Sequence, residues 1–280
     1  MTQILTLDEI VEKAPSVGAK TPHSGVSARY KFMDSLKVLK TLYNNGFSAR
    51  SAMQNTARKD DQRGHEKHLI RLRHESIQER GGYTPEIVMI NSHDRTSGFS
   101  LLLGIYREVC SNGLMIGTTL MGYAKRHLSG LTSQGVRGII GRFGKMSNQV
   151  TEKIDRMRTT ELTHEQRITY ANKVVGVRVP SIEAQISEYV DRNALRSAPP
   201  KHRMALENNA RGAVAQNILK VRREEDSGTD VWSTLNVVQE NFMSGFYNPL
   251  SRRRGRPINN INQDIEVNKA VWSEAEKLIV

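Results

Sequence analysis

The sequence predicts an α+β fold, in which an antiparallel sheet of four or five strands flanked by helices precedes a mostly helical C-terminal half. Three observations predict it. Short apolar or alternating runs occupy residues 47–119, as is typical of strands. Asn112-Gly113 lies between two of these runs and suits a tight hairpin turn, because both central residues of that turn need a positive φ. Apolar residues at helical spacing take over from residue 147 onward.

The chain divides into three predicted ranges. Residues 1–28 form an N-terminal arm or docking segment, with a short amphipathic piece before a loop rich in Pro, Gly and Ser. Residues 29–178 form an α+β core that contains a basic, Gly-rich segment, and residues 179–280 form a helical C-terminal region. The core opens with a helix that Asp34 caps and Asn45-Gly46 ends.

Four or five strands are predicted in the core, from the runs at residues 47–56, 66–74, 86–90, 99–106 and 114–119. The run at 99–106 also fits a short helix, but we favour a strand because Gly104 is a poor helix former and the Asn-Gly turn follows. In the second strand, alternation puts Lys67, Arg71 and Arg73 on one face. Such a face can lie along a nucleic-acid backbone or can be an ordinary solvated outer face.

The segment after the hairpin carries the strongest electrostatic signal. No acidic residue occurs between Glu108 and Glu152. The basic side chains in that interval lie among glycines and near the rings of Tyr123, His127 and Phe143; they are Lys125, Arg126, Arg137, Arg142 and Lys145. This composition predicts a flexible loop that closes on phosphates and stacks on bases, in preference to a mobile surface loop with incidental charge.

The C-terminal half reads as a series of helices. Thr163 and Gln166 form a capping box, an apolar stripe from Val231 to Phe242 ends at Gly245, and a last amphipathic helix covers 271–279. Between the last two helices lies a cluster of four arginines, Arg252, Arg253, Arg254 and Arg256. Such a cluster is either a phosphate-binding patch or a solvated connection.

Composition narrows the function classes. The net charge is +12 and the pI is about 9.9, which favours phosphate backbones, acidic protein surfaces or anionic membranes as partners. The single Cys110 cannot form an intramolecular disulfide, and no apolar run reaches membrane-spanning length. We therefore expect a cytoplasmic protein that uses no membrane.

Enzymatic interpretations are weaker. His93-Asp94, with His65, His68 and His74 upstream, superficially resembles a metal phosphohydrolase, but here the pair lies between strands and not on a helix. An Asx-type hydrogen bond is the expected role of Asp94. Cys110 with His127 is a still weaker nucleophile pair. We expect no catalytic residue, no metal and no cofactor.

Several ordered motifs carry a family resemblance, which extends from Arg29 almost to the C-terminus. They are NSHDRTSGF (91–99), GIYREVCSNGL (104–114), KRHLSG (125–130), DVWSTLNVVQENFMSG (230–245) and VNKAVWSEAEKL (267–278). Together they resemble the family of phages, plasmids and integrated elements called domain of unknown function 932, of the YafZ and YfjQ type. The resemblance implies a mobile-element protein of a bacterial cytosol and supplies no catalytic residue. Arg95 departs from the family pattern, where glycine is expected.

The resulting hypothesis is a non-enzymatic protein of a phage or plasmid that binds nucleic acid, specifically single-stranded DNA, in recombination or annealing. A strand meander followed by a long helix is similar in outline to phage annealing recombinases, an analogy at the level of fold. A homo-oligomer and a host protein are further expected partners. The alternative is an inhibitor that docks a basic surface on an acidic host defence or repair protein.

Overall fold

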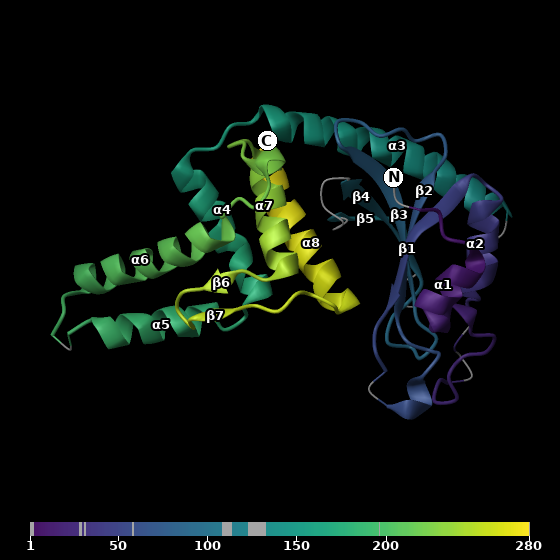
Figure 1. The fold of residues 1–280 in the computed structure, drawn as a ribbon, viewed down its shortest axis with the longest axis horizontal. Helices are drawn as coiled ribbons and strands as arrows, with labels where there is room; N and C mark the ends of the chain where they lie inside the picture. Colours follow the sequence, from purple (N-terminus) through teal and green to yellow (C-terminus); the bar gives the residue numbers. More distant parts are fainter. Residues whose placement is uncertain are drawn as a thin grey trace. The chain divides into compact units, whose positions relative to one another are not determined.

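The computed structural model describes residues 3–27, 30, 32–57, 59–107, 114–122, 133–195 and 197–279. The chain forms two compact units, Met1–Val150 and Thr151–Val280 (Figure 1). The helix α3 (Ser133–Thr159) begins in the first unit and ends in the second.

The first unit is built on a five-stranded sheet in which every neighbouring pair is antiparallel and the strands follow chain order. The strands are β1 (Phe47–Gln54), β2 (His68–His74), β3 (Tyr83–Asn91), β4 (Ser100–Arg107) and β5 (Leu114–Gly122). The predicted antiparallel sheet is confirmed, including a strand rather than a helix after Phe99. The predicted turn at Asn112-Gly113 lies outside the described residues.

Strand β3 contains Pro85, which has no N–H for a sheet hydrogen bond. The pairing explains why it is tolerated. Residues of β3 pair with β2 only from Ile87 onward, whereas Pro85 pairs with Ile105 of β4 on the other side. Pro85 therefore lies where β3 has a free edge, the position at which sheets accept proline.

The N-terminal segment packs within the first unit. It contains α1 (Leu7–Lys13) and the 3₁₀ turn η1 (Pro15–Gly18), and α2 (Ser35–Tyr43) follows. The helices α1 and α2 lie beside β1, and η1 contacts both helices (Figure 1). Ile10, Ala14 and Val17 are fully buried. As predicted, the Asp34 side chain caps α2 by accepting from the N–H of Lys37, and Gly46 follows the helix with φ 81°.

The predicted Gly-rich loop is wrong where the chain is described, because residues 133–159 form the helix α3. Ile139, Phe143 and Val150 are buried at helical spacing along it. Four glycines at a spacing of three, Gly135 to Gly144, each cost about 0.5–1 kcal/mol in a helix relative to alanine. Burying a large apolar side chain contributes about 1.5–3 kcal/mol, so two or three such residues outweigh the glycines.

The second unit is helical, as predicted. Its helices are α4 (His164–Arg178), α5 (Ile182–Asn193), α6 (Pro200–Ile218), α7 (Val231–Ser244) and α8 (Ile261–Glu276), with a 3₁₀ turn η3 (Glu224–Asp226). Two short strands, β6 (Tyr247–Asn248) and β7 (Arg253–Arg254), pair between α7 and α8. The Thr163–Gln166 capping box is confirmed. No helix in the described parts of the chain has the length and apolar character needed to cross a membrane.

Candidate nucleic-acid interface

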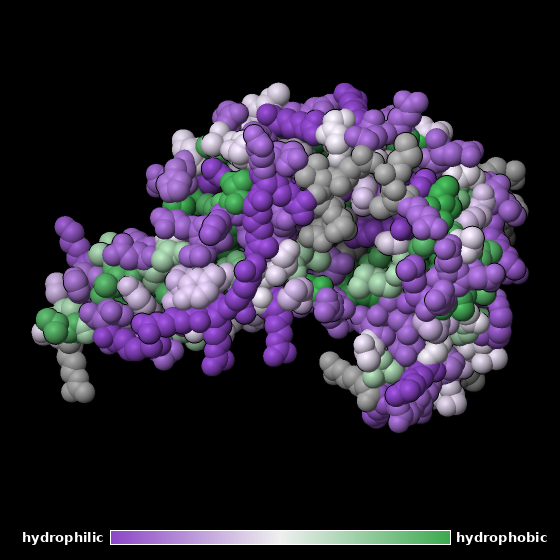
Figure 2. Space-filling model, in the orientation of Figure 1, coloured by the Kyte–Doolittle hydropathy of each residue, from purple (hydrophilic) through white to green (hydrophobic). Residues whose placement is uncertain are grey.

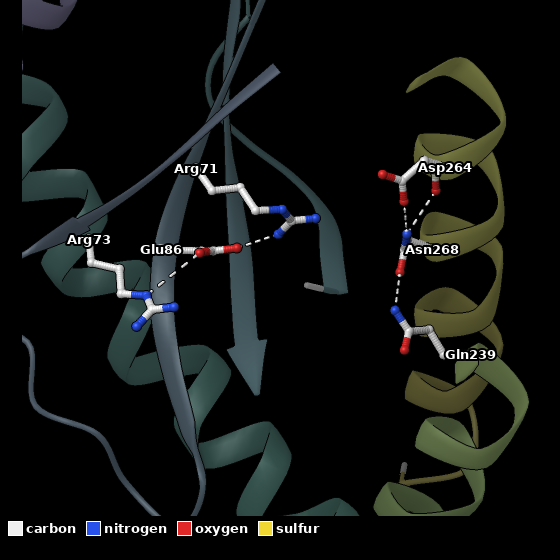
Figure 3. A network of polar contacts seen from close by, with 6 residues as sticks. All are labelled: Arg71, Arg73, Glu86, Gln239, Asp264 and Asn268. Atoms are coloured by element: carbon white, nitrogen blue, oxygen red, sulfur yellow. Dashed lines mark hydrogen bonds and ion pairs between the residues drawn. The ribbon is translucent and has the colours of Figure 1, made fainter. Parts of the chain in front are cut away.

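The basic face predicted on β2 is not a free row of cations. Lys67 and Arg71 are buried. The fully buried carboxylate of Glu86, on β3, accepts a hydrogen bond from Arg71 Nη1, and its other oxygen lies 3.9 Å from Arg73 Nε (Figure 3). The Arg73 guanidinium also lies 3.6 Å from the centre of the Tyr106 ring. Alternation within one strand could not reveal Glu86, because the carboxylate comes from the neighbouring strand.

The residues predicted to bind in the Gly-rich segment differ in their exposure to solvent. Phe143 is 2% exposed and packs against Phe47 with ring centres 5.6 Å apart, so in this structure its ring is not open to a nucleic-acid base. Arg142 and Lys145 are exposed on α3, and Arg142 Nε donates to the Gly138 carbonyl one turn earlier. Arg137 also belongs to α3, whereas Lys125 and Arg126 lie outside the described residues.

The four late arginines are brought together on one hairpin, which we call the arginine ribbon (residues 245–256, containing β6 and β7). Arg252, Arg253, Arg254 and Arg256 are all exposed. Figure 2 shows hydrophilic side chains gathered over this hairpin. Within the described parts of the chain, none of the four guanidinium groups pairs with a carboxylate. The ribbon is therefore a concentration of unneutralised positive charge.

Backbone contacts fix the shape of the ribbon. Gly245 has φ 81°, and a Cβ at this position would overlap the carbonyl oxygen of Gly255, so the two strands approach as closely as only glycine allows. The Gly255 N–H donates to the Phe246 carbonyl at 2.9 Å. At the turn, Asn248 Oδ1 accepts from the N–H of Leu250, and its Nδ2 donates to Gln185 Oε1 on α5. The ribbon is thereby closed at its tip and attached to a helix.

Two arginines outside the predicted cluster hold the base of the ribbon. Arg178, at the end of α4, donates to the carbonyl oxygens of Phe242 and Arg256, and burial lowers its pKa. Arg222 donates from Nε to Asn241 Oδ1 at 2.7 Å and from Nη2 to the Gly245 carbonyl at 2.9 Å. These bonds satisfy carbonyl groups at the end of α7 and fix where the ribbon leaves the helix.

Sequence reasoning missed two features of this surface. Tyr247 is 47% exposed and pairs across the ribbon with Arg254, so both side chains lie on one face. Arg222 lies on a loop far from the cluster in sequence. An exposed aromatic residue close to an arginine cluster is a readable signal, whereas the position of Arg222 depends on the tertiary fold.

Local hydrogen bonds hold the His93-Asp94 loop. Asp94 Oδ1 accepts from the N–H of Thr96 at 2.9 Å, which confirms the predicted Asx-type bond, and Arg95 has φ 70° at the position where glycine is expected. Upstream, His68 bonds through Nδ1 to Ser16 and through Nε2 to Ser35, and Ser35 also accepts from Asn91. These buried bonds connect the N-terminal segment, α2 and the sheet.

The polar face of α7 is also structural. Asn241 Nδ2 donates to the carbonyls of Ile218 and Lys220 at the end of α6, and Arg223 pairs with Glu240. Gln239 donates to Asn268 of α8 at 3.0 Å, and Asn268 donates to Asp264 (Figure 3). Buried amides of this kind need such partners, because an unpaired polar group costs about 1–3 kcal/mol.

Comparison with known proteins identifies the family of the chain. Residues 22–272 match a family described as "Domain of unknown function (DUF932)". The chain is 30% identical over 279 residues to the UPF0380 protein YfjQ and 29% identical over 279 residues to the UPF0380 protein YafZ, both of Escherichia coli strain K12. Each alignment covers 98% of this chain and 92% of the relative. No solved structure matches. The protein therefore belongs to the DUF932 family.

Proposed function

We propose that this protein is a non-enzymatic nucleic-acid-binding protein of a phage or plasmid, and that it binds single-stranded DNA during recombination or annealing. The arginine ribbon carries the proposal. Four exposed guanidinium groups on a short, anchored hairpin present fixed hydrogen-bond donors to phosphate oxygens. Anchoring matters because side chains on an ordered backbone lose less conformational entropy when they bind.

Single-stranded DNA is favoured over duplex DNA by the aromatic ring of the ribbon. Tyr247 is exposed beside Arg254, and an unpaired base can stack on such a ring, whereas a base inside a duplex cannot. The combination of an aromatic ring and a positively charged surface is the usual arrangement in proteins that bind single strands without sequence preference.

The rival function, an inhibitor that docks on an acidic host protein, uses the same arginines. Carboxylates and phosphates are both bound by guanidinium groups, so charge does not separate the two. The presence of Tyr247 does not separate them either, because exposed tyrosines also occur in protein interfaces; measured binding of DNA does. Comparing the DNA affinity of the wild type with that of ribbon variants decides between them.

We expect the purified protein to bind a labelled oligothymidylate with strong salt dependence. If about five phosphates are neutralised, the logarithm of the association constant falls with the logarithm of salt concentration at a slope of roughly −3 to −4. The double variant Arg253→Gln, Arg256→Gln should bind about tenfold more weakly and lower the magnitude of the slope by about 1 to 1.5, because two phosphate contacts are lost. Fluorescence anisotropy at several salt concentrations measures both quantities.

The matched control is Lys37→Gln, Lys40→Gln, which removes the same charge from exposed positions on α2 in the first unit. Its affinity should change by less than about threefold, since general electrostatic attraction is weakened without loss of a contact. Wild-type protein that binds no oligonucleotide even at low salt, but does bind an acidic protein, would refute the proposed function in favour of the inhibitor.

A further inference from the structure

We infer that Arg222 and Arg254 together form a clamp for a single phosphate group, at the base of the arginine ribbon and beside Tyr247. This inference deepens the proposed function, on which it rests, by assigning a specific phosphate site within the DNA-binding surface. Arg222 does not belong to the arginine cluster in sequence, and only the fold brings it to Arg254.

The two guanidinium groups converge on one atom. Arg222 Nη2 donates to the carbonyl oxygen of Gly245 at 2.9 Å, and Arg254 Nε donates to the same oxygen at 3.3 Å. The two nitrogens therefore cannot be farther apart than the sum of these distances. Two positive groups are held close together although they repel each other, and one neutral carbonyl oxygen is the partner they share.

In the described part of the chain, no carboxylate forms an ion pair with either arginine of the clamp. The negative charge of Glu240 acts to raise the pKa of Arg222, but Glu240 Oε1 already accepts from Arg223 Nε at 2.8 Å. Partial burial lowers the pKa of Arg222, and the positive charge of Arg254 lowers it further. An anion that bound both groups would relieve this repulsion.

Both arginines have donors left for a ligand. A guanidinium group carries five N–H bonds. The contacts described above use Nε and one N–H of Nη2 in Arg222, and only Nε in Arg254. Both residues are exposed, so a phosphate can reach the remaining N–H groups. A phosphate offers several oxygens in the geometry that paired guanidinium groups bind best.

Tyr247 identifies the kind of phosphate. It pairs with Arg254 across the ribbon, so its ring lies on the face where Arg254 lies. A phosphate in the clamp therefore has an exposed aromatic ring beside it. A nucleotide unit supplies both matching groups, because its phosphate is charged and its base stacks.

A double-mutant cycle tests the clamp. Arg222→Gln, Arg254→Gln and the double variant are compared with wild type for binding to labelled oligothymidylate. If both side chains hold one phosphate, each single change should weaken binding about tenfold, and the double variant should be little weaker than either single variant. In all three, the magnitude of the salt slope should fall by about 0.7, the value for one phosphate. Losses that multiply in the double variant, with a slope change twice as large, would overturn the shared site.

The control cycle pairs Arg222→Gln with Arg253→Gln, where the two losses should multiply because the residues contact different phosphates. Arg222→Lys is the control for misfolding. It keeps the positive charge but lacks the planar guanidinium group, so its DNA affinity should fall while its circular dichroism spectrum stays that of wild type.

Inorganic phosphate is a second probe that needs no DNA. It should raise the melting temperature of wild type and have a smaller effect on each single variant. A response that is absent, or equal in all of them, would overturn the clamp. If phosphate stabilises only the wild type while no DNA binds, the clamp stands and the proposed function fails.

Discussion

The arginine residues of this molecule differ in whether a neighbouring carboxylate balances their charge. Arg71 is buried and its charge is balanced by the fully buried Glu86, so a phosphate would have to displace an internal ion pair in order to bind there. Arg253 and Arg256 are exposed, and no carboxylate in the described chain pairs with them. Charge count in a sequence does not distinguish these cases, but the position of the nearest carboxylate does.

His68 shows how burial sets the behaviour of a single residue. Its imidazole is fully buried, and its two ring nitrogens lie 2.9 Å from Ser16 Oγ and 2.8 Å from Ser35 Oγ. Burial, reinforced by the neighbouring His93, lowers the pKa of His68 from 6.5 to about 3. Folded protein therefore holds this histidine neutral at a pH where the unfolded chain would protonate it.

The first unit should consequently lose stability in acid. Because the pKa is lower in the folded state, the unfolded chain takes up the proton first, and stability that is complete above about pH 6.5 falls steadily down to about pH 3. Between about pH 7.5 and pH 5.5 the loss should be about 1.4 kcal/mol. Both tryptophans lie in the second unit, so hydrogen exchange of the β2 and β3 amides is the suitable measurement.

The variant His68→Asn provides the comparison. It lacks the titrating ring, so between about pH 7.5 and pH 5.5 its free energy of unfolding should fall by about 1.4 kcal/mol less than that of wild type. This difference does not depend on the stability of the variant at neutral pH. An identical pH dependence in both proteins would mean that His68 is not the group responsible.

At the scale of single elements, local signals predicted most of the fold. The Asp34 cap, the Thr163–Gln166 capping box and the glycine after α7 each determine a helix end through contacts within a few residues. The strand after Phe99 was predicted from Gly104. These features can be predicted from sequence because the residues that determine each of them lie within a few positions of it.

The flexible loop predicted between Glu108 and Glu152 is wrong, where the chain is described, for a different reason. Burial of Ile139 and Phe143 in α3 outweighs the intrinsic cost of the glycines. The same burial takes Phe143 out of the predicted binding surface. For the candidate site, the arginine cluster was predicted and Arg222 was not, because its distance from Arg254 depends on how α6 and α7 pack.

At the scale of the element, the backbone conformation of the arginine ribbon depends on one glycine, Gly245. Gly245→Ala places a methyl group against the Gly255 carbonyl and imposes a positive φ on a residue with a side chain. We expect a loss of about 2–4 kcal/mol in the free energy of unfolding and much weaker DNA binding. Urea unfolding followed by tryptophan fluorescence reports on this unit, because Trp232 and Trp272 both belong to it.

Gly212→Ala is the matched control, since Gly212 lies inside α6 and an added Cβ would meet no atom within 4 Å. It should stabilise the same unit by about 0.4–1 kcal/mol and leave DNA binding unchanged. A tolerated Gly245→Ala would show that the ribbon does not require the close approach of its two strands.

At the scale of the whole molecule, positive charge is unevenly distributed between the two units. Residues 1–150 contain 21 basic and 12 acidic side chains, whereas residues 151–280 contain 20 and 17. Most of the excess positive charge therefore belongs to the first unit, although the arginine ribbon belongs to the second. Under the proposed function, long-range attraction of DNA and short-range contact with it would thus be carried by different parts of the chain.

This separation predicts different kinetic effects for charge removed from each unit. Lys37→Gln, Lys40→Gln weakens the overall field, so it should slow association with oligothymidylate by no more than about threefold and leave dissociation unchanged. Arg253→Gln, Arg256→Gln removes contacts made in the complex, so most of its tenfold loss of affinity should come from dissociation, about fivefold faster, with association slowed only about twofold. Stopped-flow fluorescence at low and moderate salt measures both rates. If the lysine variant speeds dissociation as much as the arginine variant does, DNA is held by the first unit, and the ribbon only attracts it.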